Sequence, residues 1–286
     1  MIVTHIFGGL GNQLFQFAFG KALAARLGVE LRIDTRYFDK PRPDELCLHH
    51  FSINTPEVVR KRLPAMRHDG LLPYLAAKIR GDDWTMFKEK SLAYDPAEKT
   101  LGDGTYLKGY WQTELYFKDH ADLVRQHLQV ITPPTDENRK VMEEQDSCYP
   151  VSLHVRRGDY VSNPKFNAVH GTCDLDYYRR AADLIVERIG REPVFFAFSD
   201  EPDWVRENLK LPYPMRIVSH NGPEHNYEDI RLMYRCRHHI VANSSFSWWG
   251  AWLNPDPGKI VVAPKRWFAD PAMQDHNLVP ESWVQI

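Results

Sequence analysis

The sequence predicts an α/β protein with two domains, each built around a parallel sheet. The chain begins with a strand, a glycine loop, a helix and a second strand, and after residue 149 short apolar runs alternate with helical patterns. Such alternation is typical of parallel sheets covered by helices on both faces. Pro133 and Pro134 interrupt regular structure between the two parts. We therefore expect two Rossmann-like domains that face a cleft, at residues 1–148 and 149–286.

The first domain is predicted to open with a βαβ unit. Residues 1–7 form a β-branched run, and the glycine-rich stretch 8–12 breaks it. Apolar residues then recur at helical spacing, with Gly28 as the expected stop of the helix. A second strand is predicted at 29–34.

The second domain is predicted from its regular alternation. Strands are expected at 150–155, 193–200, 215–219, 238–245 and 259–264, and helices at 174–190, 201–209, 226–236 and 245–253. Pro202 suits the first turn of its helix, where the missing N–H costs nothing. The tryptophans of the last helix, Trp248, Trp249 and Trp252, are expected to pack in the core.

Composition limits the function classes. Of the 286 residues, 43% are hydrophobic, and the formal net charge is −2, so no global basic field attracts nucleic acid. The four cysteines are scattered, which favours free thiols in a reducing compartment. No apolar run is long enough for a transmembrane helix, and the first residues lack the basic start of a signal peptide. We expect a cytoplasmic protein.

The stretch HVRRGDY, residues 154–160, follows an expected buried strand. Ligands of parallel α/β sheets bind at the carboxyl ends of strands. Alternation places His154 and Arg156 on one face of the strand, and Arg156 and Arg157 at its end. Guanidinium groups bind phosphate oxygens bidentately, so two in sequence suit a diphosphate. A solvated turn with an internal bridge from an arginine to Asp159 is the alternative.

Two further strand ends carry polar side chains. Ser199 and Asp200 end the second strand of this half, and Asn243, Ser244 and Ser245 lie where a strand turns into a helix. The N–H groups of a helix N-terminus bind anions, and serine hydroxyls add donors. A serine that caps the helix explains the same pattern, and a cap residue can also face a ligand.

The glycine loop 8–12 leaves another function open. Gly9 and Gly11 fit the first two positions of a dinucleotide-binding G-x-G-x-x-G motif, but Leu14 occupies the third. Asp34 ends the next strand, where a ribose-binding acid would lie. An NAD(P)-dependent oxidoreductase is therefore one alternative, and a non-catalytic glycan-binding protein, favoured by the eight tryptophans, is another.

The sequence DLD, residues 174–176, is similar to the D-x-D of metal-dependent sugar transferases. Here it opens an amphipathic helix, so Asp174 is interpreted as an N-cap and the metal interpretation is disfavoured. No metal or other cofactor is expected.

Together these segments resemble the bacterial α1,2-fucosyltransferases, which transfer fucose from GDP-fucose to galactose. The resemblance is carried in order by GGLGNQLFQFAFGKALA, GYWQTELYF, HVRRGDY, FSDE and DIRLMYRCRHHIVANSSFSWWGAWLN. It spans nearly the whole chain. It implies a GT-B-like architecture, with the donor in the C-terminal domain and the acceptor mainly in the N-terminal one, and an inverting reaction without metal.

The resemblance also implies roles for individual residues. Arg156 is the expected catalytic contact to the diphosphate of GDP-fucose, which is a substrate here and not a cofactor. Other donor contacts are expected from His154, Arg157, Ser199, Asp200, Asp229, Asn243, Ser244 and Ser245. Asp159 and His170 are the candidates for the general base. Asn12 and Gln13 are expected on the side of the galactose-terminated acceptor.

A basic segment at residues 58–80 suggests weak peripheral membrane contact. It contains Arg60, Lys61, Arg62, Arg67, Lys78 and Arg80 against one acid, Asp69. Such a segment can bind an anionic lipid surface, and enzymes of the resembling family often act on lipid-linked glycans. A solvated helical face is the more ordinary interpretation of a charge run.

Overall fold

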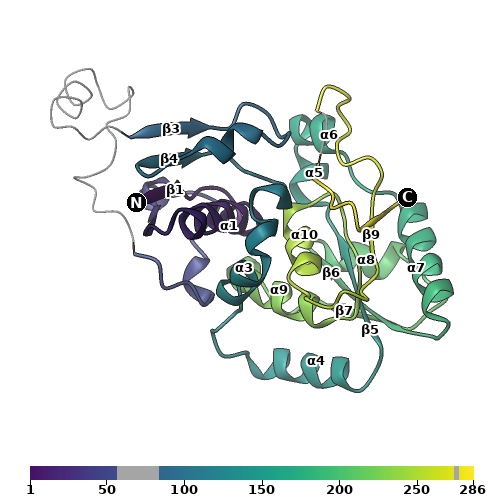
Figure 1. The fold of residues 1–286 in the computed structure, drawn as a ribbon. Helices are drawn as coiled ribbons and strands as arrows, with labels where there is room; N and C mark the ends of the chain where they lie inside the picture. The colour runs from purple at the N-terminus through teal and green to yellow at the C-terminus, as the bar shows by residue number, and fades with distance from the viewer. Residues whose placement is uncertain (57–83, 274–276) are drawn as a thin grey trace. The chain divides into compact units, whose positions relative to one another are not determined.

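The structure is a computed structural model that describes residues 1–56, 84–273 and 277–286 (Figure 1). The basic segment 58–80 lies outside the described residues. The chain divides into two compact units, Met1–Leu128 and Gln129–Ile286. The division precedes the boundary expected at residue 148, because helix α4 (Asp136–Asp146) packs on α9 (Asn226–Arg235) of the second unit. The Gln145 side chain contributes by donating from Nε2 to the Leu232 carbonyl over 2.8 Å.

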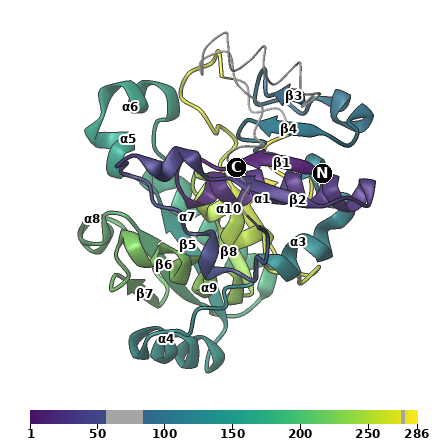
Figure 2. The same ribbon diagram turned by 90° about the vertical axis from the view of Figure 1, so that its left-hand side faces the viewer.

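The first unit contains a four-stranded parallel sheet in the order β2-β1-β4-β3, as Figure 2 shows. Its described elements are β1 (Ile2–His5), α1 (Leu10–Leu27), β2 (Leu31–Asp34), β3 (Thr85–Lys88), β4 (Thr105–Lys108) and α3 (Ala121–His127). The predicted βαβ start is confirmed. Gly28 ends α1 in the left-handed conformation, with φ of 65°, which glycine adopts without steric cost.

The second unit contains a six-stranded parallel sheet in the order β10-β9-β8-β5-β6-β7. Its strands are β5 (Pro150–Val155), β6 (Val194–Ser199), β7 (Met215–Val218), β8 (His238–Ile240), β9 (Val261–Ala263) and β10 (Val284–Gln285). Besides α4 and α9, its helices are α5 (Gly158–Ser162), α6 (Pro164–His170), α7 (Leu175–Ile189), α8 (Pro202–Asn208) and α10 (Ser245–Trp252).

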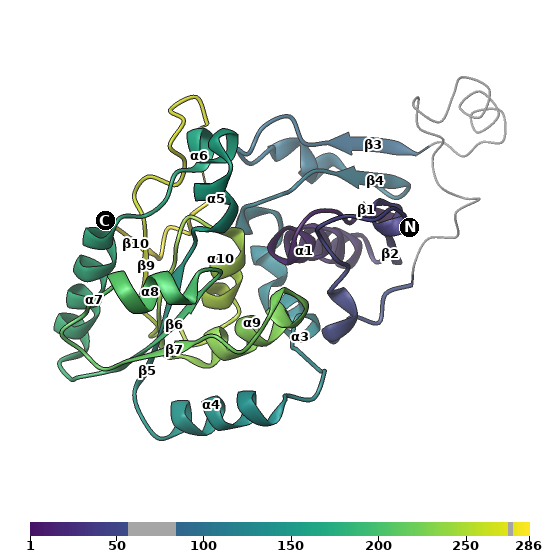
Figure 3. The same cartoon turned by 180° about the vertical axis from the view of Figure 1, so that it is seen from behind.

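Helices cover both faces of this second sheet (Figure 3). The side chains of Val151, Leu153 and Val155 pack with α7 and α8 on one face, while α9 packs against α10 on the other. All six residues of β5 are buried, as the centre of a doubly covered sheet requires. The predicted packing role of Trp248, Trp249 and Trp252 is confirmed, because each is at most 2% exposed.

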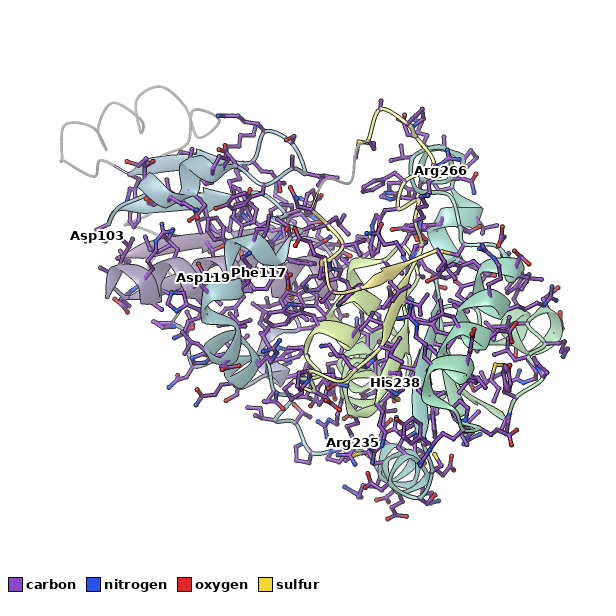
Figure 4. All side chains as sticks on the ribbon, turned by 45° about the vertical axis from the view of Figure 1, so that its right-hand side comes forward. Asp103, Phe117, Asp119, Arg235, His238 and Arg266 are labelled. Carbon is purple, nitrogen blue, oxygen red and sulfur yellow. The ribbon has the colours of Figure 1, made fainter. Side chains whose placement is uncertain are left out.

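The two ends of the second sheet differ in what surrounds them. Arg266 follows β9 and lies beside α5 and α6, whereas His238 and Arg235 lie toward the opposite, amino end of the strands (Figure 4). The loop after Arg266 is bonded to α6, since Ala269 N donates to the Val169 carbonyl over 2.9 Å. Among the described helices, none is long and apolar enough to cross a bilayer.

Candidate active site

The strand order of the second sheet selects one position for a ligand. From β5 the chain first adds β6 and β7 on one side, and it then returns to add β8 and β9 on the other. The order therefore reverses between β5 and β8. In open α/β sheets, ligands bind outside the carboxyl ends of the strands at such a reversal. Arg156 follows β5, and Ser244 and Ser245 lie just beyond β8, so the two predicted phosphate contacts lie on either side of it.

Arg156 is fixed by two carboxylates at the end of β5. Its Nη2 donates to Asp159 Oδ1 over 2.5 Å, and its Nη1 lies 2.9 Å from Asp200 Oδ2. The guanidinium also lies over the ring of Tyr160, 5.2 Å from its centroid. The side chain remains 31% exposed. Arg156 is therefore oriented by the protein and still accessible to an anionic ligand, and the internal bridge to Asp159 is also present.

Arg157 is more engaged than its neighbour. Its Nε donates to Glu201 Oε2 over 2.9 Å, and its guanidinium stacks 3.7 Å above the ring of Trp204. Its side chain is 18% exposed. These contacts tie the end of β5 to α8, so the position of Arg157 is determined by the protein itself.

Gly158 explains how Asp200 reaches this turn. A Cβ at Gly158 would lie 2.4 Å from Asp200 Oδ2, closer than real contacts allow. Asp200 Oδ1 also accepts the backbone N–H of Arg157 over 3.0 Å. Burial raises the pKa of Asp200, although the charge of Arg156 opposes the shift. Ser199 Oγ accepts the N–H of Glu201 over 3.0 Å, so both predicted residues at the end of β6 shape this turn.

His154 is a neutral hydrogen-bonding group. It is 5% exposed, and its ring lies 5.6 Å from that of Phe246 on α10. Burial and the neighbouring charge of Arg156 lower the pKa of His154 to about 3, so the ring carries no charge at neutral pH. Its Nδ1 is buried and has no hydrogen-bond partner in the described part of the chain. His154 therefore provides no positive charge for a phosphate at neutral pH.

The turn from β8 into α10 caps the helix and also holds neighbouring segments in place. Ser244 is the N-cap of α10, and its Oγ accepts the N–H of Phe246 over 3.3 Å. Ser245 is the first residue of the helix and is partly exposed. The amide nitrogen of Asn243 donates to the carbonyls of His170, Gly171 and Trp267 at 3.0–3.2 Å. Asn243 therefore joins α6 to the loop after β9, which leaves Ser244 and Ser245 as the candidates for phosphate contact.

Asp229 lies on α9, beyond the carboxyl end of β7. Its Oδ1 accepts a hydrogen bond from Asn221 Nδ2 over 2.7 Å. Burial raises the pKa of Asp229 to about 7, against the effect of this hydrogen bond. The described contacts of Asp229 do not include Arg156 or the serine turn.

The two candidate bases lie on the α5–α6 pair. Asp159 is 45% exposed and bound to Arg156. His170 ends α6, and its ring stacks on Tyr160 at 4.5 Å and an interplanar angle of 8°. Burial lowers the pKa of His170, with Asp159 opposing and Arg156 reinforcing the shift. Asp159 thus contacts Arg156 directly, and His170 stacks on the same ring that Arg156 covers.

The interpretation of DLD as the start of a helix is confirmed. Asp174 caps α7 and accepts the N–H of Tyr177 over 2.7 Å, and Asp176 pairs with Arg180 at 2.8 Å. Within residues 1–56, 84–273 and 277–286, no group of three His, Cys, Asp or Glu side chains could hold a metal ion.

The candidate residues of the first unit, Asn12, Gln13 and Asp34, differ in how deeply they are buried. Gln13 is fully buried, and its amide bonds the Gly8 and Glu45 carbonyls and the Cys47 N–H, so it supports the neighbouring loops. Asn12 is only partly buried and accepts a hydrogen bond from Gln112 Nε2 over 2.7 Å. Burial raises the pKa of Asp34, but hydrogen bonds from Arg36 and Tyr106 outweigh it and lower that pKa.

Sequence reasoning missed the aromatic residues around Arg156. Tyr160, Trp204 and Phe246 each contact a predicted site residue. Tyr160 lies only four residues after Arg156, within the stretch HVRRGDY, so a signal for it was present in the sequence. Trp204 and Phe246 lie on other elements, and their proximity comes only from the fold.

Comparisons with known proteins agree with this geometry. The family described as Glycosyl transferase family 11 matches residues 87–286. An alpha-1,2-colitosyltransferase of Escherichia coli is 32% identical, over 100% of this chain and 99% of the relative. The O-antigen biosynthesis glycosyltransferase WbnK of E. coli is 30% identical over 98% of each chain. A galactoside alpha-(1,2)-fucosyltransferase 1 of Ateles belzebuth is 27% identical, over 86% of this chain and 63% of that protein.

A solved structure supports the fold alone. The fucosyltransferase NodZ from Bradyrhizobium superposes with a TM-score of 0.50 and 14% identity, over 87% of this chain and 91% of that one. The predicted GT-B-like α/β fold class is thereby confirmed. The full-length relatives and the family match together set aside the NAD(P)-dependent oxidoreductase and the non-catalytic glycan-binding protein. The chain belongs to glycosyltransferase family 11 and is a glycosyltransferase.

Proposed function

We propose that this glycosyltransferase moves L-fucose from GDP-β-L-fucose to the 2-hydroxyl of a terminal galactoside, with inversion and without a metal. The observation that carries the proposal is the fixed, accessible guanidinium of Arg156 at the strand-order reversal of the second sheet. A family member that releases a nucleoside diphosphate needs positive charge at the phosphates. The proposed α1,2 linkage is supported by the similar proteins that are named as α1,2-colitosyl- and α1,2-fucosyltransferases.

The donor half of the reaction follows from charge development. As the bond between fucosyl C1 and the diphosphate oxygen breaks, negative charge grows on the β-phosphate. A preoriented guanidinium stabilises that charge more in the transition state than in the ground state. Asp159 and Asp200 keep Arg156 in one orientation, so little reorganisation is needed during the reaction. The N–H groups at the start of α10 are the second candidate contact.

The acceptor half requires one proton transfer. The galactose 2-oxygen attacks C1 from the face opposite GDP, forming the α linkage, and its proton passes to a base. His170 has the neutral imidazole that a base needs, because burial lowers its pKa. Asp159 Oδ1 already accepts the hydrogen bond from Arg156 Nη2. We therefore favour His170.

Colitose is the second candidate donor sugar. It is favoured by the 32% identical colitosyltransferase, which covers the whole chain. Colitose lacks the 3-hydroxyl of fucose, so the two donors differ at a single position of the ring. The choice depends on whether the protein hydrogen-bonds that hydroxyl, since a site built for a hydroxyl rejects the analogue that lacks it.

The proposal is tested with the purified chain, both GDP-sugars and a panel of β-galactosides. We expect transfer from GDP-fucose, with a product whose NMR spectrum shows an α linkage to galactose O2. Faster transfer from GDP-colitose would replace fucose by colitose in the proposal. A different linkage, or turnover of neither donor with any galactoside, would contradict it.

A further inference from the structure

The first unit carries an exposed aromatic surface at the carboxyl edge of its own sheet. We call Phe7, Tyr37 and Tyr110 the aromatic platform. The ring of Phe7 lies 4.9 Å from that of Tyr110 and 6.1 Å from that of Tyr37. Tyr110 is 40% exposed, and the other two are partly exposed. Exposed large rings that gather from three separate segments are a feature of binding surfaces.

The platform lies at the second strand-order reversal of the molecule. The chain passes from β1 outward to β2, whereas β4 and β3 lie on the other side of β1. Phe7 follows β1 and Tyr110 follows β4, so the two rings come from the two strands at the reversal. This is where open parallel sheets bind ligands.

Tyr110 is held in place by a strained turn. Trp111 has a positive φ of 58°, rare for a large side chain, and is fully buried. The Glu89 carboxylate accepts the N–H groups of Tyr110 and Trp111, each over 2.8 Å. A Cβ at Gly109 would lie 2.4 Å from Glu89 Cβ, so glycine is required there. Strain of this kind persists at sites where a side chain must be presented in one orientation.

Polar groups contact Tyr37, and an amide pair lies two residues after Tyr110 in the chain. Gln112 donates to Asn12, and in the described part of the chain no protein group bonds the Asn12 amide nitrogen or the Gln112 amide oxygen. Tyr37 donates to Asp44 Oδ2 over 3.3 Å, and the Arg42 guanidinium lies 4.6 Å from the centroid of its ring. Burial raises the pKa of Tyr110, and the nearby Tyr37, Glu89 and Asp44 reinforce the shift.

These features identify the chemistry of the ligand. A ring face with partial negative charge attracts the apolar C–H face of a pyranose, and amide and carboxylate groups bond its hydroxyls. We propose that the aromatic platform binds a pyranose ring of the acceptor glycoside, with Tyr110 as its stacking residue. This inference rests on the proposed transfer to a galactoside.

The test measures sugar binding without catalysis. Saturation-transfer NMR with methyl β-galactoside and N-acetyllactosamine is compared for the wild type, Tyr110→Ala, Tyr110→Phe and Met86→Ala. Met86 is the matched control, because it is 42% exposed on the same unit but lies on β3, outside the platform. We expect the signal to be lost in Tyr110→Ala and retained in Tyr110→Phe and Met86→Ala. Equal signals in the wild type and Tyr110→Ala, loss in Met86→Ala as well, or no signal from the wild type would overturn the platform.

Kinetics separate this inference from the proposed function. In Tyr110→Ala the acceptor KM should rise about 3- to 10-fold, the effect of one stacked ring, while acceptor-independent hydrolysis of GDP-fucose stays unchanged. If the wild type turns over no GDP-fucose but the NMR pattern holds, the donor assignment fails and the platform stands. If transfer occurs and the acceptor KM of Tyr110→Ala is unchanged, the platform fails and the proposed function stands.

Discussion

Arg156 is the residue on which the donor assignment depends most. Replacing it by alanine should lower kcat by about two to three orders of magnitude, as loss of one transition-state charge donor does. The partly exposed side chain is not part of the core, so the variant should melt as cooperatively as the wild type. The control is Arg206→Ala, which removes an exposed arginine paired with Asp203 on α8. Near wild-type turnover of a folded Arg156→Ala protein would refute the role.

His170 predicts a pH dependence. Because burial lowers its pKa below the ordinary 6.5, the neutral, proton-accepting ring persists into mildly acidic solution. The fall of kcat in acid should therefore lie at lower pH than a histidine with the ordinary pKa would give, as the imidazole becomes protonated. In His170→Gln the rate should fall about 100-fold or more, and this acidic limb should disappear. The pH profile of both proteins is the measurement, and an unchanged limb in the variant would assign the base elsewhere.

The sequence could place some candidate residues and not others. Arg156 was placed correctly at the end of a strand, because it directly follows an apolar run, and the structure puts that strand end at the strand-order reversal. Asn12 and Gln13 could not be distinguished, because α1 is apolar on nearly all sides and its pattern does not reveal which face is buried. The three-dimensional packing, which buries Gln13 completely, decides between them.

At the scale of elements, the turn from β5 into α5 depends on one glycine. Gly158→Ala places a Cβ 2.4 Å from Asp200 Oδ2, so Asp200 must move away from Arg156. Misplacement of a catalytic group by about 1 Å can cost about 100-fold in rate, and we expect a loss of about 10- to 100-fold in kcat/KM. Gly102→Ala is the control, since a Cβ there meets open space. Equal kinetics of the two variants would show that Asp200 does not orient Arg156.

The elements themselves were predictable in proportion to their length and burial. β5 has the bounds expected from its apolar run, because a strand covered on both faces needs apolar residues throughout. The helices α5 and α6 were not foreseen, because five and seven residues are too few to show helical periodicity. One signal for α6 was available, since Asn163 caps it and Pro164 occupies its first turn.

At the scale of the whole molecule, catalysis should not require a metal ion. Arg156 supplies the positive charge at the phosphates in the proposed mechanism, and Asp174 and Asp176 are engaged in α7 and its ion pair. Transfer measured in excess EDTA should equal transfer in buffer alone. Loss of activity in EDTA that added Mn²⁺ or Mg²⁺ restores would show that a metal takes the role assigned to Arg156.

Weak attraction to anionic lipid remains a prediction of the sequence alone, since the basic segment lies outside the described residues. Each cation near such a surface contributes at most about 1 kcal/mol, and salt weakens the effect. Sedimentation with anionic vesicles at low salt should capture the wild type more than a variant with Arg60, Lys61 and Arg62 changed to Gln. Neutral vesicles are the control. Equal capture of both proteins by anionic vesicles would show that the basic segment does not attract the protein to lipid.

The two strand-order reversals have a consequence for how this protein can diversify. One is built entirely from Met1–Leu128 and the other from Gln129–Ile286, so the chain segments do not interleave. Consider a single crossover between two homologous genes in the stretch that encodes residues 129–135. It would exchange the ligand-binding end of one sheet and leave that of the other sheet intact. Under the roles proposed above, such recombination would combine a new acceptor preference with an old donor in one step.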